Sequence, residues 1–290
     1  GEVHDVKIHH RGNHNMLGEV EPRHFLSLFN IDKSVQLPMD RSGRLELANW
    51  LVRPDHPLTA RVIVNRIWGW HFGKGIVSTP DNFGIMGGRP THLLLLDYLA
   101  LRFMDDGWSL KKLHRLIMLS KTYQMSAAKT TAQETDFDNI LYWKADVRRL
   151  EAEAIRDAML SLSGQLDRTI GGPPIEEVKS INLSVEDMAK NFGIYERSRR
   201  RSVYLPVIRT AIYDKLTLYD FPSSNNPVGQ RAVTTVPTQA LMMMNSDFVM
   251  KQAELIVSQI LDNDNLRSKE KTLNQLYLTL FIRQATTAEK

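Results

Sequence analysis

The chain has 290 residues, enough for one large domain or two ordinary ones, and its 42% hydrophobic content is typical of a globular protein with a buried core. Cysteine is absent, which excludes disulfides, cysteine nucleophiles, thiolate metal sites and cysteine-attached haem from this stretch. The net charge of +4 is small beside 37 basic and 33 acidic residues, so composition gives no indication of nucleic-acid binding. No run approaches the ~18 uncharged apolar residues of a membrane-spanning helix, and we expect no membrane span. The chain starts without methionine and stops in what resembles a new helix, so we expect a piece of a longer protein.

Two stretches far apart in the sequence are predicted to form strands. Apolar and polar side chains alternate near residues 3–8 and again near residues 202–209. A lone strand would leave its backbone groups unsatisfied, so we expect these two stretches to pair as a small two-stranded β element. Residues 15–40 are predicted to be extended loop, because prolines punctuate them and no apolar period is present.

The rest of the sequence predicts a mainly α protein, a helical bundle with long ordered loops. Apolar residues recur at helical spacing, and short connections favour antiparallel neighbours. The predicted helices cover approximately residues 44–52, 59–72, 92–106, 110–120, 149–162, 238–244, 247–261 and 269–283. Thr91, Ser109 and Ser268 are predicted N-caps, and Pro237 suits a first helical turn. We expect a single domain over residues 1–290, with any sub-boundary near residues 164–200, where glycines and prolines interrupt the pattern.

The helix predicted at residues 59–72 carries two stripes. One is apolar, and the other mixes cations, an amide and aromatic side chains where a solvated face would carry lysine and glutamate; its members are Arg61, Asn65, Arg66, Trp68 and Phe72. Asp55 is predicted to cap the start of this helix, and His71 and Gly73 fit its end.

The loop of residues 73–90 is predicted to be ordered and packed over this helix. It is long and rich in glycine, yet it holds large apolar side chains that a disordered segment would lack. Its polar contribution is Asp81 and Arg89, with His92 just beyond. The alternative is that these side chains only satisfy loop carbonyls and amides.

Charged residues crowd the start of the helix predicted after residue 148. Arg149 with Glu153, and Glu153 with Arg156, can pair along a solvated helix face. The alternative makes Glu151 or Asp157 a buried carboxylate held by arginines from elsewhere, and paired carboxylates could act on a glycosidic bond.

Three further features have ordinary explanations that we prefer. The basic run Arg197, Arg199, Arg200 and Arg201 lacks interleaved aromatics, so a solvated loop or an internal ion-pair donor is favoured over a nucleic-acid site. The methionines at 242–244 are predicted to be core filler rather than a haem ligand. The histidines at 9, 10 and 14 have no carboxylate at a recognisable spacing, so no metal site is predicted.

The chain resembles the DUF1553 family, also called PSD1. The stretches that carry the resemblance run in family order across nearly the whole chain: RLELANWLVRPDHPLTARVIVNRIWGWHFGKGIVSTPDNFG, GGRPTHLLLLDYLALRF, GWSLKKLHRLIMLSKTYQMS, RRLEAEAIRDAMLSLSGQLDRTIGGPP, RRSVYLPVIR and VTTVPTQALMMMNSDFV. The resemblance implies a planctomycete-type domain of a large extracytoplasmic bacterial protein, periplasmic or at the cell surface, beside DUF1549 and cytochrome c-like domains. Those chains occur with polysaccharide-degrading functions. The family supplies no catalytic residues, and any haem would belong to a separate domain, with no cofactor in this stretch.

These observations favour a non-catalytic module that binds a ligand or partner, such as an anionic polysaccharide, because arginine forks suit sulfate or carboxylate and aromatic rings suit sugar faces. The alternatives are a carboxylate-based hydrolase or lyase that uses Asp81, Glu151 or Asp157, and a scaffold that docks neighbouring domains. The predicted ligand-binding residues are Arg61, Asn65, Arg66, Trp68, His71, Asp81, Arg89, His92, Arg148 and Arg231. A pocket that joins them would favour binding, whereas internal pairing would favour the scaffold.

Overall fold

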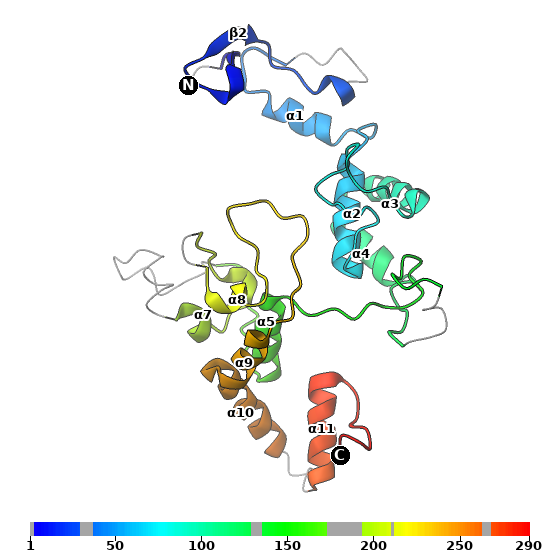
Figure 1. Ribbon diagram of the computed structural model, residues 1–290, viewed down its shortest axis with the longest axis vertical. Helices are drawn as coiled ribbons and strands as arrows, with labels where there is room; N and C mark the ends of the chain where they lie inside the picture. The colour runs from blue at the N-terminus through cyan, green and yellow to red at the C-terminus, as the bar shows by residue number, and fades with distance from the viewer. Residues whose placement is uncertain (1–2, 30–36, 129–134, 173–192, 210–211, 263–267) are drawn as a thin grey trace. The chain divides into compact units, whose positions relative to one another are not determined.

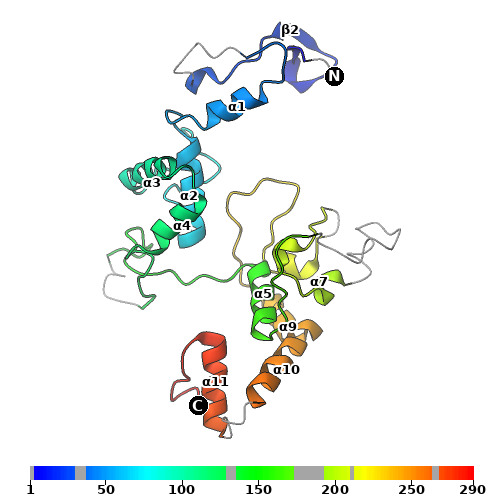
Figure 2. The same cartoon turned by 180° about the vertical axis from the view of Figure 1, so that it is seen from behind.

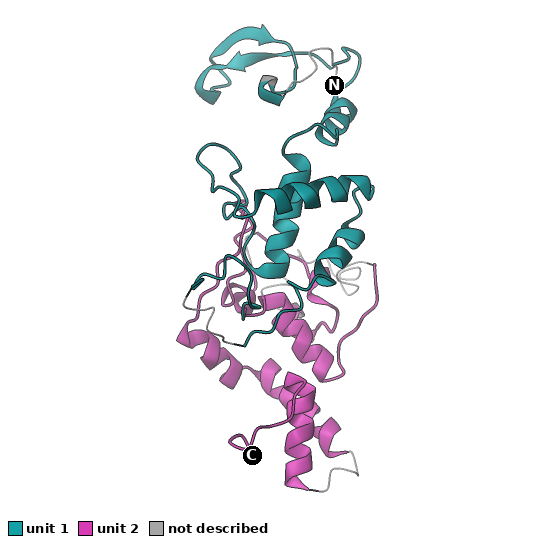
Figure 3. Cartoon of the chain, turned by 90° about the vertical axis from the view of Figure 1, so that its right-hand side faces the viewer, with its two compact units in different colours: residues 1–147 teal, residues 148–290 magenta. Residues whose placement is uncertain are grey.

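The computed structural model describes residues 3–29, 37–128, 135–172, 193–209, 212–262 and 268–290 (Figure 1). These residues form ten α-helices and one two-stranded antiparallel sheet, which confirms the mainly α class. They divide into two compact units, residues 1–147 and residues 148–290, each taken by itself below (Figure 3). The division differs from the sub-boundary expected near residues 164–200, of which 173–192 lie outside the described residues, and a single domain stays a prediction. None of the described helices has the length and apolar character needed to cross a bilayer.

The strand expected at the start of the chain is present, but the partner predicted for it was wrong. β1 (Val6–His9) pairs antiparallel with β2 (Leu17–Glu21), which lies in the stretch predicted to be loop. Ser202–Tyr204 form a 3-10 turn, and the rest of residues 202–209 is in no strand. A short hairpin costs less chain entropy to close than a pairing across most of the sequence. The backbone of Ser202 is satisfied differently, because its N–H donates to the Asp157 carboxylate at 2.8 Å.

Unit 1 continues with four helices, of which α2, α3 and α4 lie together in both views of the chain (Figures 1 and 2). They are α1 (Arg44–Leu51), α2 (Thr59–Phe72), α3 (Leu93–Asp105) and α4 (Leu110–Met118). Gly73 ends α2 and Gly107 follows α3, both with left-handed backbone, at φ values of 83° and 71°. The Ser109 side chain accepts from the Lys112 N–H at the start of α4, as predicted.

Two predicted caps are wrong, and in both cases another contact uses the side chain. Asp55 pairs with Arg53 at 2.6 Å, and His56 Nδ1 accepts from the Thr59 N–H at 3.2 Å at the start of α2. Thr91 does not cap α3 because its hydroxyl donates to the Ile76 carbonyl at 3.2 Å. This hydrogen bond links the end of the loop of residues 73–90 to its beginning.

The core of unit 1 forms where α2, α3, α4 and the loop after α2 meet. Its buried apolar residues are Val64, Ile67, Trp68, Ile76, Val77, Leu96, Leu99, Phe103, Leu113 and Ile117. Burying each large side chain contributes about 1.5–3 kcal/mol. Two members of the second stripe of α2 belong to the interior, because Trp68 is part of this core and Asn65 is buried beside it.

Unit 2 packs its helices around a second core. They are α5 (Ala152–Leu162), α7 (Ile194–Arg197), α8 (Asp214–Thr217), α9 (Pro237–Asn245), α10 (Asp247–Leu261) and α11 (Lys269–Phe281). Pro237 is the first residue of α9, and Ser268 caps α11 by accepting from the Lys271 N–H, as predicted. The buried core residues are Ala152, Tyr195, Leu205, Leu216 and Tyr219. Met242 packs against them as core filler, whereas the next two methionines are exposed.

Candidate functional site

The loop after α2 is fixed to that helix by one buried amide. Asn65 Nδ2 donates to the Val77 carbonyl at 3.0 Å, and its Oδ1 accepts from the Val77 N–H at 2.7 Å. Gly75 passes so close that a Cβ there would lie 2.7 Å from Asn65 Nδ2. Asn65 is therefore occupied in holding the loop, which is ordered here as expected.

The arginines predicted to bind a ligand in unit 1 are mostly paired internally. Arg61 donates to Asp97 at 2.6 Å, and Arg66 donates to Asp81 at 2.7 Å. Arg89 is exposed and has no partner among the described residues. Paired guanidinium groups of this kind hold a loop more readily than they offer donors to a ligand.

The aromatic and histidine side chains of this region also contact one another. Trp68 Nε1 donates to the Tyr142 hydroxyl at 2.8 Å, and the His92 ring lies 5.7 Å from the same tyrosine ring. His71 Nε2 and His114 Nδ1 are 2.7 Å apart and share a hydrogen bond between α2 and α4. These contacts stabilise unit 1.

In unit 2 the ion pairs predicted along the α5 surface are wrong. Glu153 accepts a bidentate pair of bonds from Arg231, at 2.7 and 2.9 Å, in place of bonds from Arg149 or Arg156. Exposed Glu151 lies 3.3 Å from the same guanidinium. Arg149 and Arg156 use their guanidinium groups elsewhere, on Asp220 and on the Tyr195 carbonyl, so the bidentate pair forms with Arg231.

The three candidate catalytic carboxylates have structural roles or solvent exposure. Asp157 accepts from the N–H and hydroxyl of Ser202, at 2.8 and 2.6 Å. Asp81 is paired with an arginine, and Glu151 and Arg148 are exposed. None of these side chains lines either of the two cavities described next. Whether the candidate residues of the two units meet stays a prediction.

Unit 2 contains a cavity of about 310 Å³ between α5, α7 and α10, which we call the outer hollow. The residues that carry its chemistry are Arg197, Arg199, Phe248, Lys251, Gln252 and Leu255. The volume falls at the lower end of the range for small-molecule sites, on the order of 300–1,000 Å³. Small-molecule sites usually combine apolar side chains with a few polar or charged groups.

Positive charge prevails in the outer hollow. Its ionisable residues are Glu196, Arg197, Arg199, Asp247 and Lys251. Glu196 is neutralised by a short contact with the Lys215 ammonium, which holds the pKa of that carboxyl below its usual value. By contrast, Arg199 and Lys251 have no carboxylate partner among the described residues. The hollow therefore presents donors that a bound anion could use.

Arg156 holds the backbone segment that forms one wall of the outer hollow. Its guanidinium is buried and donates to the backbone oxygens of Tyr195, Ser198 and Arg200 and to the Ser202 hydroxyl. The bonds to Tyr195 and Arg200 are both 3.0 Å long. Burial lowers the pKa of Arg156, but a guanidinium remains charged in proteins.

The backbone segment held by Arg156 includes Arg199, which lines the outer hollow. Ser198 and Arg200 turn their carbonyls to Arg156, while the intervening Arg199 carbonyl accepts from the Asp167 N–H at 2.8 Å. Residues one apart in extended chain face opposite sides. Arg199 can therefore reach the hollow while its neighbours are anchored inward.

Gln252 supplies an amide donor at the hollow. Only 6% of this residue is exposed, and its Oε1 accepts from the Ser163 hydroxyl at 2.6 Å. Ser163 is itself held by Gln259, whose Nε2 donates to the Ser163 carbonyl. The Nε2 group of Gln252 has no partner among the described residues. An amide donor that lines a cavity and has no protein partner is available to a ligand or water.

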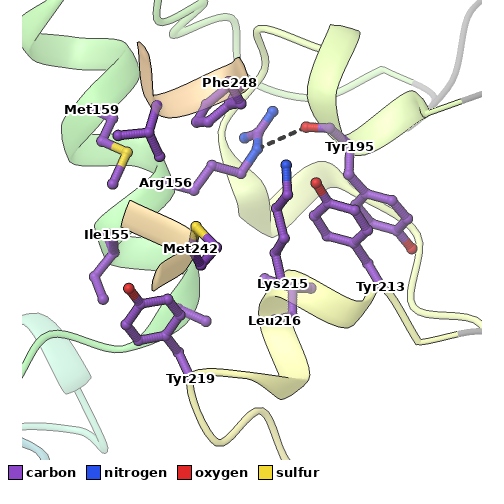
Figure 4. Close-up of a pocket in the computed structure, with 12 residues that line it drawn as sticks. Ile155, Arg156, Met159, Tyr195, Tyr213, Lys215, Leu216, Tyr219, Met242 and Phe248 are labelled. Carbon is purple, nitrogen blue, oxygen red and sulfur yellow. Dashed lines mark hydrogen bonds between the residues drawn. The ribbon is translucent and has the colours of Figure 1, made fainter. Parts of the chain in front are cut away.

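A smaller space, the inner cavity, is lined by residues of α5, α7, α8, α9 and α10 (Figure 4). Its volume is about 30 Å³, room for about two water molecules. Its wall is largely apolar, and the members used below are Ala152, Ile155, Met159, Met242, Phe248 and Val249. Phe248 also lines the outer hollow.

A comparison with known families matches residues 43–290 to PSD1, described as a protein of unknown function (DUF1553). The match covers well over half of the chain. The chain belongs to the PSD1 family. The β1–β2 hairpin lies outside the match. Comparisons with curated proteins and with solved structures found no match.

The sequence of this PSD1 chain contained one signal for the outer hollow, the basic run. Its interpretation, as a solvated loop or an internal ion-pair donor, did not include the bonds that Arg200 donates to the Thr169 and Gly171 carbonyls. It missed Arg199, which lines the hollow. Lys251 and Gln252 gave no signal, because a lysine and a glutamine on an amphipathic helix are ordinary surface residues.

Proposed function

We propose that this PSD1 chain is a non-catalytic binding module that holds an acidic sugar unit in the outer hollow. The module would serve a larger extracytoplasmic protein linked to redox chemistry or polysaccharide utilisation, beside DUF1549 and cytochrome c-like domains. In that arrangement any haem belongs to a neighbouring domain. The observation that carries the proposal is the presence of two cations in the hollow, Arg199 and Lys251, with no carboxylate partner among the described residues, next to the Gln252 amide.

The chemistry of the hollow favours an anionic sugar over a neutral one. A carboxylate or sulfate group would accept charge-assisted hydrogen bonds from Arg199 and Lys251. The Phe248 ring and the Leu255 side chain offer an apolar surface against which a sugar face can pack. Gln252 Nε2 would donate to a ring hydroxyl or to the anionic group itself.

The test is calorimetric titration of the chain with short galacturonate oligosaccharides, a sulfated oligosaccharide and a neutral cello-oligosaccharide. We expect the acidic sugars to bind and the neutral one to bind at least about ten-fold more weakly, since a hydrogen bond to a charged group is worth about 1.5–3 kcal/mol. Lys251→Ala and Arg199→Ala should each weaken acidic-sugar binding by about ten-fold. Added salt should reduce the affinity of the unchanged chain more than that of either variant.

The matched control is Lys271→Ala, which removes an exposed lysine of α11 outside the hollow. This variant should bind as the unchanged chain does. Equal binding of neutral and acidic sugars, or equal losses in Lys251→Ala and Lys271→Ala, would refute the proposal.

A second candidate, docking of a neighbouring domain, is supported by a separate observation in unit 1. Ile85 and Met86 are 102% and 88% exposed on the loop that Asn65 anchors. Exposed apolar side chains on fixed backbone are typical of protein contacts. In the full-length protein, Ile85→Ser with Met86→Ser should increase proteolysis between domains, whereas an unchanged cleavage pattern would contradict this role.

A further inference from the structure

The inner cavity and the outer hollow adjoin at one aromatic side chain. Phe248, at the start of α10, is the residue common to the linings of both spaces. Sequence neighbours on three helices face the two spaces, namely Met159 and Leu160, Tyr195 and Glu196, and Phe248 and Val249. The two spaces thus lie back to back, and Phe248 is half-buried between them.

The polar groups around the inner cavity are already satisfied. The hydroxyl of Tyr195 donates to the Pro206 carbonyl, that of Tyr213 to Glu196 at 3.0 Å, and that of Tyr219 to the Gln239 carbonyl at 3.3 Å. The Arg156 guanidinium donates to the Tyr195 carbonyl (Figure 4) and also to the Ser198 and Arg200 carbonyls. Burial, together with the bond to Glu196, raises the pKa of Tyr213, so this hydroxyl stays neutral. The cavity therefore offers little to a polar group and suits an apolar one.

The wall of the inner cavity can also adapt its shape. Met159 and Met242 lie on it, and methionine is the side chain that adjusts most readily to an irregular apolar partner. A volume of about 30 Å³ corresponds to a group about the size of a methyl or acetyl substituent.

We propose that the ligand is an O-acetylated acidic sugar, whose acetyl methyl group enters the inner cavity when the Phe248 ring rotates aside. This inference rests on the proposed function, because the acidic part of the ligand occupies the outer hollow. No bond is made or broken. Burial of the acetyl methyl group adds to the affinity, and the Arg199 and Lys251 cations of the outer hollow orient the sugar.

The test compares O-acetylated with de-acetylated galacturonate oligosaccharides of equal length by calorimetric titration. We expect the acetylated form to bind about four-fold more tightly, the effect of burying roughly one methyl group. Met242→Phe, which fills the cavity with a rigid side chain, should abolish this preference while the de-acetylated form binds as before. Phe248→Ala should extend the preference to butyrylated oligosaccharides by opening the partition. Thermal unfolding of both variants checks that they fold.

The outcomes separate this inference from the proposed function. Equal affinity for the two forms, with binding still dependent on Lys251, would overturn the acetyl inference and leave the acidic-sugar site standing. A preference that persists in Met242→Phe would also overturn it. Failure of both forms to bind would overturn the acidic-sugar site, and this inference with it.

Discussion

Replacing Arg156 with methionine tests the central packing arrangement of unit 2. Arg156 is 7% exposed, and its guanidinium satisfies three backbone carbonyls and the Ser202 hydroxyl. Methionine keeps the apolar stem but leaves those carbonyls without donors and Asp157 without its cation. A buried acceptor left unsatisfied costs about 1–3 kcal/mol, and breaking a buried charged pair costs about 3–5 kcal/mol. We expect Arg156→Met to lower the free energy of unfolding by about 3–5 kcal/mol, and Arg156→Lys by roughly half as much.

The assay combines denaturant unfolding followed by circular dichroism with hydrogen exchange of peptides from residues 195–205. Exchange should accelerate there in Arg156→Met, and peptides from α2 serve as an internal reference. The control is Arg168→Ala, because Arg168 is exposed and makes one bond, to the Ser161 hydroxyl at 3.1 Å. That variant should change stability by less than about 0.5 kcal/mol. A loss below about 1 kcal/mol in Arg156→Met, or unchanged exchange in residues 195–205, would refute the reasoning.

Two further perturbations follow from the geometry. Gly75→Ala should destabilise unit 1 by about 1–3 kcal/mol in thermal unfolding, since the new Cβ would meet the buried Asn65 amide. Gly84→Ala is the control and should cost far less, because its Cβ would meet only an exposed side-chain oxygen at 3.3 Å. Equal losses of stability in the two variants would contradict this explanation. The bonds that Asp220 accepts from Thr234 and from the Arg149 guanidinium lower the pKa of this carboxyl to about 2. The contribution of Asp220 to stability is therefore complete above about pH 4 and is lost as the pH falls toward 2. The stability difference between the unchanged chain and Asp220→Asn should therefore shrink over that interval in acid titrations, and a constant difference would show that the carboxylate charge is not involved.

The helices could be predicted because their signals are local. The apolar period of α2, the left-handed glycine at its end and the serine caps at positions 109 and 268 each act within one or two turns. The strand at the start of the chain was also predicted, but its partner was not. Alternation of side chains shows that a segment can form a strand and contains no information about which segment it will meet.

The ion pairs show the same limit for charged residues. Glu153 has two arginines within helical reach, yet it pairs with Arg231, far along the chain. Local spacing could identify the possible neighbours on the helix, whereas the bidentate geometry depends on where the loop of residues 221–236 returns to α5. The candidate site of unit 1 stays a prediction, and local spacing did not show that Asn65 and Arg66 would hold the loop that was expected to present ligand-binding groups.

The basic run shows how structure and binding can be combined in one segment. Four arginines close together would repel one another if all faced solvent on one side. Here the carbonyls on either side of Arg199 are anchored on Arg156, and Arg200 bonds to carbonyls of residues 169 and 171. Arg199 is thereby directed to the outer hollow, where Lys251 from α10 adds a second cation. Arg156 fixes the backbone of the segment that carries Arg199. This backbone would not need to be ordered when a ligand binds, and the conformational cost of binding is correspondingly reduced.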